Sequence, residues 1–595
     1  MSNGETLKPA RLSTKNGVPY SINFGDIYHD PDFKREVEKV LLDPSNLTSM
    51  KRQVSILRVG ELGFGTGLNL AAVAKTCRAN NQPLHFVSCD QFPIHKSQFS
   101  RIAKKRLGQY PFYSELIDAY PPLIKGWHRR HFKRWDITIS LYWGSVHGAL
   151  QDLQEQNSPK FNAWFLDGFS PAKNPEMWDF QIMSKIGALS KKGTTVATFT
   201  SAGQVRRNLE EVGFKMRPVD QQPNKRESLA GVYNKKGLPK RPSCSSSIIL
   251  GAGLAGATLA RQLAERGLNV AVFDKGKSSA GGASKIPISM LHSRLLSDSS
   301  SSAKLRCHAY QYSIAQMNQA GVKPEGAIQI PDQNTPLSKL VKLANLYSPT
   351  GDWIQLINSK KAESLTKWNI SSSALWFPYS RMIEMPKLCR HLLDHPNIKV
   401  SYGADIQLKD IDPDIPTTLA CANAYKDFTE AHFLEVQATE GQIDIVSADE
   451  VPAIPIVGSS YLMPKDNQLY VGSTYETTAW KQGEATKKNR EALKKLNVVE
   501  TKWLGKWRAS RCSSSDRIPV VGKLVDHKGQ HIRNLYASLA MGSMGNIFSH
   551  FAAEIIASQI CNDFPPLTSG LLEEISPLRF RKRQKRRGYR LQAKP

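Results

Sequence analysis

Short apolar runs alternate with longer amphipathic stretches through the first 240 residues. The strand-like runs are residues 56–60, 84–89, 137–142, 163–166 and 195–199. Helix-forming sequence separates them, and this alternation predicts an α/β domain. The pattern returns once at 246–274 and then becomes less regular before strand signals at 468–472 and 535–539. A second nucleotide-binding α/β domain, interrupted by a substrate domain, would produce that order.

A stretch rich in Pro, Lys and Ser separates the two patterns. With 595 residues the chain is too long for one hydrophobic core, so we expect two domains. The polar stretch at 236–247 is predicted to be the linker between them. The predicted organisation is therefore a first domain at 1–235, a second at 248–578 and a basic tail at 579–595.

A glycine-rich turn follows the first strand. The motif E-L-G-F-G-T-G-L-N starts at Glu61, and its glycines are Gly63, Gly65 and Gly67. Asp90 ends the next strand, where a carboxylate can accept hydrogen bonds from ribose hydroxyls. No phosphate-loop lysine follows Gly67, which disfavours ATP. A tight turn without a ligand remains the alternative for the glycines alone.

A second motif lies at the end of a strand of the same domain. D-G-F-S-P-A-K-N-P-E-M-W begins at Asp167, directly after the run 163–166. Open α/β sheets bind ligands at the carboxyl ends of their strands, so Asp167 is a candidate site residue. The alternative is a turn in which this aspartate only caps the backbone.

The second domain opens with the fingerprint G-A-G-L-A-G, whose glycines are Gly251, Gly253 and Gly256. Asp274, at the end of the next strand, suits the ribose of an ADP group. This pattern alone does not separate FAD from NAD. Two further motifs favour FAD: G-G-A-S at 281–284, with Gly282, Ala283 and Ser284, and M-G-S-M-G before a helix, with Gly542 and Gly545. The positive end of that helix would favour a reduced, anionic flavin.

Taken together, these motifs resemble one family. The first-domain motifs with T-F-T-S-A-G-Q-V-R-R at 198–207, and R-C-S-S-S-D-R-I-P-V-V-G at 511–522, are similar to the bifunctional tRNA 5-methylaminomethyl-2-thiouridine biosynthesis (MnmC) family. The resemblance implies a class I, Rossmann-like methyltransferase domain that uses S-adenosyl-L-methionine. It also implies a D-amino-acid-oxidase-like FAD domain, with a Rossmann-type dinucleotide fold and an α+β substrate domain.

The resemblance also implies an activity, an enzyme of two functions acting on the wobble uridine of tRNA. The FAD domain would remove the carboxymethyl group of 5-carboxymethylaminomethyl-(2-thio)uridine, and the methyltransferase domain would then methylate the resulting amine. Glu61 and the three glycines would surround the methionine end of the donor, with Asp90 on the ribose and Asp167 facing the amine. An arginine fork suits the substrate carboxylate, and Arg511, with Arg508 behind it, is the candidate; a structural ion pair is the alternative.

Two positions depart from the family pattern. Ser145 stands where the family usually has an aspartate near the adenine amino group, so Gln151 or Asp152 are considered as substitute acceptors. Lys285 stands where a Gly-Asn pair begins, which would change charge and shape near the flavin.

Charge and composition indicate which binding partners and which cellular setting to expect. The formal net charge of +28 favours a polyanion, and R-F-R-K-R-Q-K-R-R-G-Y-R at 579–590 is either a solvated tail or a phosphate-binding segment. The basic and aromatic stretch 127–135 is a further RNA-binding candidate. Scattered cysteines and the lack of long apolar runs predict a cytoplasmic protein without a metal site or membrane span, with a monomer favoured. Two rival functions stay open: a fused small-amine oxidase and N-methyltransferase acting on free metabolites, and an RNA-binding protein with decayed sites.

Overall fold

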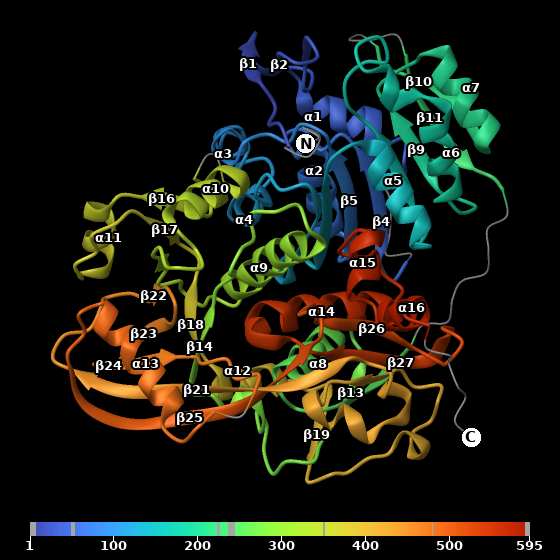
Figure 1. The fold of residues 1–595 in the computed structure, drawn as a ribbon. Coiled ribbons are helices and arrows are strands. Elements are labelled where there is room, and N and C mark those ends of the chain that lie inside the picture. The colour runs from blue at the N-terminus through green and yellow to red at the C-terminus, as the bar shows by residue number, and fades with distance from the viewer. Residues whose placement is uncertain are drawn as a thin grey trace. The chain divides into compact units, whose positions relative to one another are not determined.

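The computed structural model describes residues 7–48, 54–222, 227–235, 244–348, 351–478 and 480–588. The chain divides into two compact units (Figure 1). Unit 1 comprises Met1–Pro242 with Asn562–Ser569, and unit 2 comprises Ser243–Cys561 with Gly570–Pro595. Most of the expected linker, residues 236–243, lies outside the described residues.

Unit 1 is built on an eight-stranded sheet with the order β10-β11-β9-β8-β4-β5-β7-β6. The strands are β4 (Leu57–Leu62), β5 (Leu84–Asp90), β6 (Gly126–Phe132), β7 (Ile137–Trp143), β8 (Ala163–Leu166), β9 (Thr195–Thr198), β10 (Phe214–Asp220) and β11 (Glu227–Tyr233). Strands β9, β8, β4, β5 and β7 are mutually parallel, as the alternating pattern predicts. The order reverses at β4, so a crevice is expected at the carboxyl ends of β4 and its neighbours.

Helices connect these strands, and a small N-terminal sheet precedes them. The helices are α2 (Leu68–Ala79), α3 (Lys96–Lys104), α4 (Tyr113–Ala119), α5 (Val146–Glu155), α6 (Phe180–Ala188) and α7 (Gly203–Val212). The N-terminal elements are β1 (Leu12–Lys15), β2 (Val18–Ser21), β3 (Asp26–Ile27) and α1 (Phe33–Glu36). Two apolar cores form in this unit, one containing Phe86 and Trp143, the other Trp164 and Phe161.

A short segment from near the end of the chain completes unit 1. Phe564, within Asn562–Ser569, is fully buried in the core that contains Phe161. Asp563 accepts a hydrogen bond from His85 at 2.8 Å and lies 3.5 Å from the guanidinium of Arg129. The basic stretch 127–135 was a candidate for RNA binding, but Arg129 is 1% exposed and Arg130 4% exposed. These two arginines are therefore structural, because strand β6 places them inside the fold.

Unit 2 contains a six-stranded sheet with the order β19-β13-β12-β20-β27-β26, parallel except for β26. Its strands are β12 (Ser246–Leu250), β13 (Asn269–Asp274), β19 (Ile398–Tyr402), β20 (Thr417–Leu419), β26 (Val520–Val525) and β27 (His531–Leu539). Helix α8 (Leu254–Glu265) packs against α14 (Gly545–Ile560), as Figure 1 shows. This is the dinucleotide-binding architecture that the second fingerprint predicts.

A second sheet forms the interrupting substrate domain, with the order β16-β17-β15-β22-β23-β24-β21-β25. Its strands are β15 (Ala327–Gln329), β16 (Gln355–Ile357), β17 (Ala374–Phe377), β21 (Val436–Ala448), β22 (Ile456–Val457), β23 (Tyr461–Lys465), β24 (Gln468–Gly472) and β25 (Glu500–Ser514). The pair β14 (Ile288–Leu291) and β18 (Arg381–Glu384) lies apart from it. The helices are α9 (Ser301–Gln319), α10 (Leu337–Tyr347), α11 (Ser359–Thr366), α12 (Met385–Leu393) and α13 (Glu484–Lys495).

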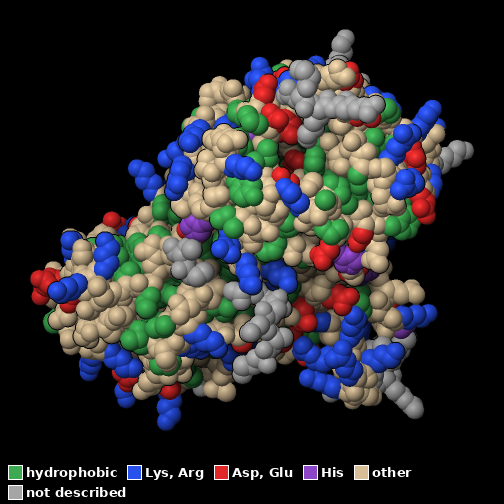
Figure 2. All heavy atoms as spheres, turned by 90° about the horizontal axis from the view of Figure 1, so that it is seen from above, with side chains coloured by type: hydrophobic (Ala, Val, Ile, Leu, Met, Phe, Trp, Pro, Cys, Tyr) green, Lys and Arg blue, Asp and Glu red, His purple; other side chains and the backbone are tan. Residues whose placement is uncertain are grey.

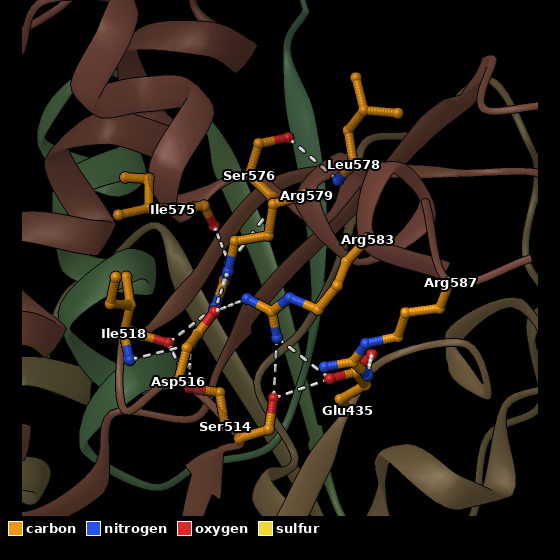
Figure 3. A network of polar contacts seen from close by, with 11 residues as sticks. Glu435, Ser514, Asp516, Ile518, Ile575, Ser576, Leu578, Arg579, Arg583 and Arg587 are labelled. Carbon is orange, nitrogen blue, oxygen red and sulfur yellow. Dashed lines mark hydrogen bonds and ion pairs between the residues drawn. The ribbon is translucent and has the colours of Figure 1, made fainter. Parts of the chain in front are cut away.

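The first half of the basic segment that starts at residue 579 forms a helix. Helices α15 (Ser569–Ile575) and α16 (Leu578–Arg586) end the described chain. Arg579 and Arg583 both bind Asp516, at 3.0 and 2.7 Å, and Arg583 also binds Glu435 at 3.0 Å (Figure 3). These guanidinium groups hold the pKa of Asp516 below its usual value despite burial. The segment is therefore docked through Arg579, Phe580 and Arg583, while Lys582 and residues 585–587 are exposed, and residues 589–595 lie outside the described part.

Phe580 gives a direct test of this docked helix. Its side chain is fully buried in a core of unit 2, so Phe580→Ala is expected to lower the free energy of unfolding by about 3 kcal/mol. Denaturant unfolding followed by circular dichroism measures this. The matched control is Lys585→Ala at an exposed position of the same helix, expected to change stability by less than about 0.5 kcal/mol. Equal effects of the two substitutions would mean that α16 does not pack as described.

Other basic side chains remain at the surface. Lys and Arg are spread over the face seen in Figure 2, with Asp and Glu among them. In the described part of the chain, no helix combines the length and apolarity that a membrane crossing requires. Among the same residues, no group of three or more His, Cys, Asp and Glu is arranged to hold a metal ion.

Candidate active sites

The cavity of unit 1 lies at the carboxyl ends of β4, β5 and β8 and has a volume of about 290 Å³. Five of the predicted site residues line it: Gly63, Gly65, Asp90, Ser145 and Asp167. Gly67 and Glu61 do not. Gly67 is the left-handed residue before α2, and Glu61 lies beneath the cavity with 2% of its surface exposed.

Asp90 holds the glycine turn in place. Its carboxylate accepts hydrogen bonds from the amides of Gly65 and Phe92, both at 2.9 Å. Burial raises the pKa of Asp90, whereas these two amides act in the opposite direction. Each carboxylate oxygen has a further acceptor position, so the group can also receive ribose hydroxyls.

Asn69 connects the two carboxylates of this site. Its side-chain amide donates to Glu61 at 2.9 Å and to Asp167 at 2.7 Å. Ser88 donates to the other oxygen of Glu61 at 2.6 Å. Burial raises the pKa of Glu61 well above its usual value, and the charge of Asp167 acts in the same direction. Asn69 thus fixes the orientation of Asp167, which also accepts from the amide of Gly168 at 2.8 Å.

Aromatic side chains from the N-terminal segment and from the loop after β8 line the same cavity. The rings of Phe24 and Phe169 stack with centroids 4.5 Å apart, and Tyr28 meets Phe169 edge-on at 5.2 Å. All three line the cavity. Packed rings of this kind exclude water from the cavity. The sequence predicted none of the three.

Ser145 lies in the cavity lining and caps a helix. Its hydroxyl accepts from the amide of Gly148 at 3.2 Å at the start of α5. The substitute acceptors considered for adenine are placed elsewhere. Asp152 is buried and accepts from the indole of Trp127 at 2.6 Å, and Gln151 donates to Glu155. Neither lines the cavity, so among the three only Ser145 is in position to contact a donor molecule there.

The cavity of unit 2 has a volume of about 490 Å³, within the range of cofactor sites. The predicted residues that line it are Gly251, Gly253, Asp274, Gly282, Ala283, Ser284, Arg511, Gly542 and Gly545. Gly256 is the exception. A β-carbon there would lie 1.8 Å from the carbonyl oxygen of Gly251, so this glycine permits close packing of α8 on β12.

Asp274 repeats in unit 2 what Asp90 does in unit 1. It accepts from the amides of Ala252 at 2.6 Å and Gly276 at 2.7 Å, and so fixes the glycine turn before α8. The hydroxyl of Ser284 accepts from the amide of Leu254, the first residue of that helix, at 3.0 Å. A diphosphate fits at this helix start, because its N-cap, Gly253, has no side chain to occupy the site. Lys285 is exposed and does not line the cavity.

The other end of the cavity is formed where β27 passes into α14. Residues 538–546 line it almost continuously. Asn546 donates to the hydroxyl of Ser289 at 3.0 Å, which ties the start of α14 to strand β14. The amino end of α14 therefore faces the cavity, as the M-G-S-M-G motif predicts, and its dipole favours negative charge there.

Arg511 lies in the same cavity with its guanidinium over Gly441. One nitrogen donates to the carbonyl of Thr474 at 3.0 Å and another to the hydroxyl of Ser473. A β-carbon at Gly441 would lie 2.3 Å from this guanidinium, so only a glycine at this position leaves space for the arginine side chain. Both of these hydrogen-bond partners are neutral. Burial lowers the pKa of Arg511. Its planar guanidinium is suited to bind a carboxylate through two parallel hydrogen bonds. Arg508, in contrast, pairs with buried Glu476 and does not line the cavity.

His292 is a cavity residue that the sequence did not predict as functional. It is 3% exposed, packs edge-on against Phe377 at 4.4 Å, and its Nδ1 lies 3.4 Å from the hydroxyl of Ser380. Its Nε2 has no hydrogen-bond partner among the described residues. A neutral imidazole with a free Nε2 can accept a hydrogen bond from a bound amine.

The protonation of His292 leads to a pH prediction. Burial and the charge of Arg294 lower its pKa to about 3, so the ring stays neutral between pH 5 and 8. His292→Gln is expected to slow substrate-dependent flavin reduction about tenfold, since one hydrogen bond to the amine is weakened. The pH profile of that rate between 5 and 8 should keep the wild-type shape. Stopped-flow absorbance measures both, and loss of a wild-type inflection near pH 6.5 would show that His292 titrates in the folded protein.

Comparisons with known proteins agree with this division. Residues 109–234 match the model of an S-adenosyl-L-methionine-dependent methyltransferase family, and residues 247–559 match the FAD dependent oxidoreductase model. The chain is 29% identical to the tRNA 5-methylaminomethyl-2-thiouridine biosynthesis bifunctional protein MnmC of Marinobacter nauticus, covering 97% of this chain and 98% of that protein. It is 28% identical to the MnmC of Hahella chejuensis, with 97% and 99% covered.

Among solved structures, glycine oxidase from Bacillus cereus covers 53% of this chain and 94% of its own, with a TM-score of 0.44 and 18% identity. MnmC2 from Aquifex aeolicus gives a TM-score of 0.31 and 21% identity over 40% of this chain and 73% of its own.

The sequence relatives confirm the resemblance predicted from the motifs over nearly the whole length of the chain. The oxidoreductase match covers more than half of the 595 residues, so the chain belongs to the FAD dependent oxidoreductase family and carries an S-adenosyl-L-methionine-dependent methyltransferase domain before it.

Proposed function

We propose that this enzyme performs two consecutive steps on the wobble uridine of tRNA. Unit 2 converts 5-carboxymethylaminomethyl-(2-thio)uridine into the 5-aminomethyl form, and unit 1 methylates that amine to the 5-methylaminomethyl form. The observation that carries the proposal is the full-length likeness to relatives named for this product, in a chain that has a cavity beside the glycine turn of each unit. The excess of basic residues and the eight cysteines, none of them in a disulfide in the described part of the chain, fit a cytoplasmic protein with an RNA substrate.

In unit 2, FAD supplies the acceptor for the hydride that leaves the carbon between the substrate's amine and its carboxylate. Arg511 binds that carboxylate in the fork of its guanidinium and so orients the carbon. His292 accepts a hydrogen bond from the N–H of the neutral amine and so orients the nitrogen, whose lone pair forms the C=N bond. Water then adds to the C=N bond, and the products are glyoxylate and the primary amine of the 5-aminomethyl group.

In unit 1, S-adenosyl-L-methionine supplies the methyl group. Asp90 binds the ribose of the donor and holds Gly65 against it. Asp167, fixed by Asn69, accepts a hydrogen bond from the attacking amine and takes the proton that the nitrogen loses once the new C–N bond has formed. The contribution of this site is mainly positioning, because attack of an amine on a sulfonium methyl requires little further activation.

The experiment is a nucleoside analysis of tRNA that carries the carboxymethylaminomethyl group. Incubation with the purified protein alone should give the aminomethyl nucleoside, and addition of S-adenosyl-L-methionine should give the methylaminomethyl nucleoside. Free glycine and sarcosine serve as controls and should be turned over at least a hundredfold more slowly, because they lack the RNA contacts. Comparable turnover of the free amines, with untouched tRNA, would instead establish a metabolic amine oxidase.

A further inference from the structure

The edge of the substrate sheet carries exposed aromatic and basic side chains together. Strand β25 is the last strand of that sheet and borders only β21. Along it, Trp503 is 41% exposed and Trp507 36%, and Lys502 and Lys506 are exposed beside them. Large aromatic side chains on an edge strand are costly to leave in water and mark a binding surface.

The register of β25 places Trp507 on the cavity side. Trp507 is opposite Ile443 and Arg511 is opposite Thr439, with no irregularity between the two pairs. Residues four apart on a strand share a face and lie about 13 Å apart. Ile443 and Arg511 both line the cavity of unit 2, so Trp507 stands on the same face at its border.

Trp503 and Trp507 are similarly exposed but lie on opposite faces of the sheet. A register shift lies between Ile445 and Val446, and the indole of Trp503 donates to the carboxylate of Asp444 at 3.1 Å. Asp444 follows Ile443 directly in β21, so its side chain points to the opposite face. Trp503 is therefore held on the face away from the cavity, and only Trp507 is directed toward it.

From this placement we infer that Trp507 is a stacking platform for an unpaired base of the anticodon loop next to the uridine whose side chain enters the cavity. The inference rests on the proposed function and specifies how unit 2 recognises its RNA. An aromatic face flanked by cations binds single-stranded RNA through stacking and phosphate contacts. Lys502, opposite Ser447, provides a cation on the face of Trp507, whereas Lys506, opposite Asp444, lies on the other face.

An RNA and a protein docked on this surface would depend on different residues of strand β25. A protein docked on the apolar side chains would use Leu504, 41% exposed, and Val499, 70% exposed, as much as the tryptophan. Those side chains have no π-face for a base, whereas their burial would contribute to a protein interface. The two occupants therefore differ in which residue of the strand matters.

The test compares Trp507→Ala, Trp507→Phe and the control Leu504→Ala in the full-length protein. The probe is a fluorescently labelled anticodon stem–loop RNA, and its dissociation constant is measured by anisotropy. Trp507→Ala is expected to weaken binding about tenfold, Trp507→Phe less, and Leu504→Ala less than twofold. FAD absorbance should be the same in all variants, because Trp507 does not line the cavity.

Unchanged RNA affinity and unchanged KM for tRNA in Trp507→Ala would overturn the inference. An equal loss in Leu504→Ala, or a concentration-dependent dimer that both substitutions abolish, would identify a protein interface instead. These results are distinct from failure of the proposed function, which would appear as a wild-type protein that leaves the tRNA unmodified. Wild-type turnover of tRNA with a normal Trp507→Ala variant would refute only the stacking platform.

Discussion

Asp167→Asn is expected to lower the rate constant of methyl transfer about a hundredfold while the oxidation step keeps its wild-type rate. The substitution preserves the size of the side chain but removes the carboxylate that receives the amine proton. Asn69 would still be able to donate to the remaining side-chain oxygen, as it does to Asp167 at 2.7 Å. Transfer of a radiolabelled methyl group to tRNA that already carries the aminomethyl nucleoside measures the effect directly.

The matched control for this substitution is Ser145→Ala in the same cavity. Because Ser145 is expected to contact only the adenine end of the donor, its loss should raise the KM for S-adenosyl-L-methionine and leave the rate constant nearly unchanged. A wild-type rate constant in Asp167→Asn would remove this residue from the reaction. A loss shared equally by both variants would point to a general disturbance of the cavity.

Arg511→Met is expected to raise the KM for the carboxymethylaminomethyl substrate about a hundredfold, since a buried charged partner of the carboxylate is lost. The FAD content, measured by visible absorbance, should remain unchanged. Arg511→Lys should recover only part of the affinity, because an ammonium cannot bind the carboxylate through two parallel hydrogen bonds. Steady-state kinetics of substrate-dependent flavin reduction provides the measurement.

Gly441→Ala serves as an independent check on the same geometry. The added methyl group would lie against the guanidinium of Arg511, so the substitution should raise the KM without removing any charge. Loss of FAD in Arg511→Met, with a normal KM in the protein that retains it, would show that the arginine supports the cofactor and not the substrate.

The parts that could be predicted from the sequence are local ones. Each glycine turn, the helix after it and the acid on the next strand lie within 30 residues of one another, so the periodicity and the glycine spacing determine their arrangement. Asp90 and Asp274 were identified in this way. Each accepts a hydrogen bond from an amide of the glycine turn that precedes it in the sequence. Gly256 was predicted to bind the cofactor, but it does not line the cavity, and its role is close packing against Gly251.

The parts that could not be predicted depend on long-range contacts. His292 acquires its role from burial among residues up to 170 positions away, such as Tyr461, which no local pattern encodes. The basic run from 579 looks like a solvated tail because its partners, Asp516 and Glu435, are distant in the sequence. Phe564 likewise gives no signal that it completes a core of unit 1, whose other residues are more than 300 positions away in the sequence. Asn69 was within the first motif, but only the geometry shows that it connects Glu61 with Asp167.

The most direct measurement of the central claim is the nucleoside composition of tRNA after incubation with the Asp167→Asn variant and S-adenosyl-L-methionine. If the product of unit 2 is the substrate of unit 1, the 5-aminomethyl nucleoside accumulates, and added Arg511→Met protein then converts it to the 5-methylaminomethyl form. If the tRNA instead retains its carboxymethylaminomethyl group, or the Arg511→Met protein leaves the aminomethyl nucleoside unchanged, the two units do not act in sequence on one substrate.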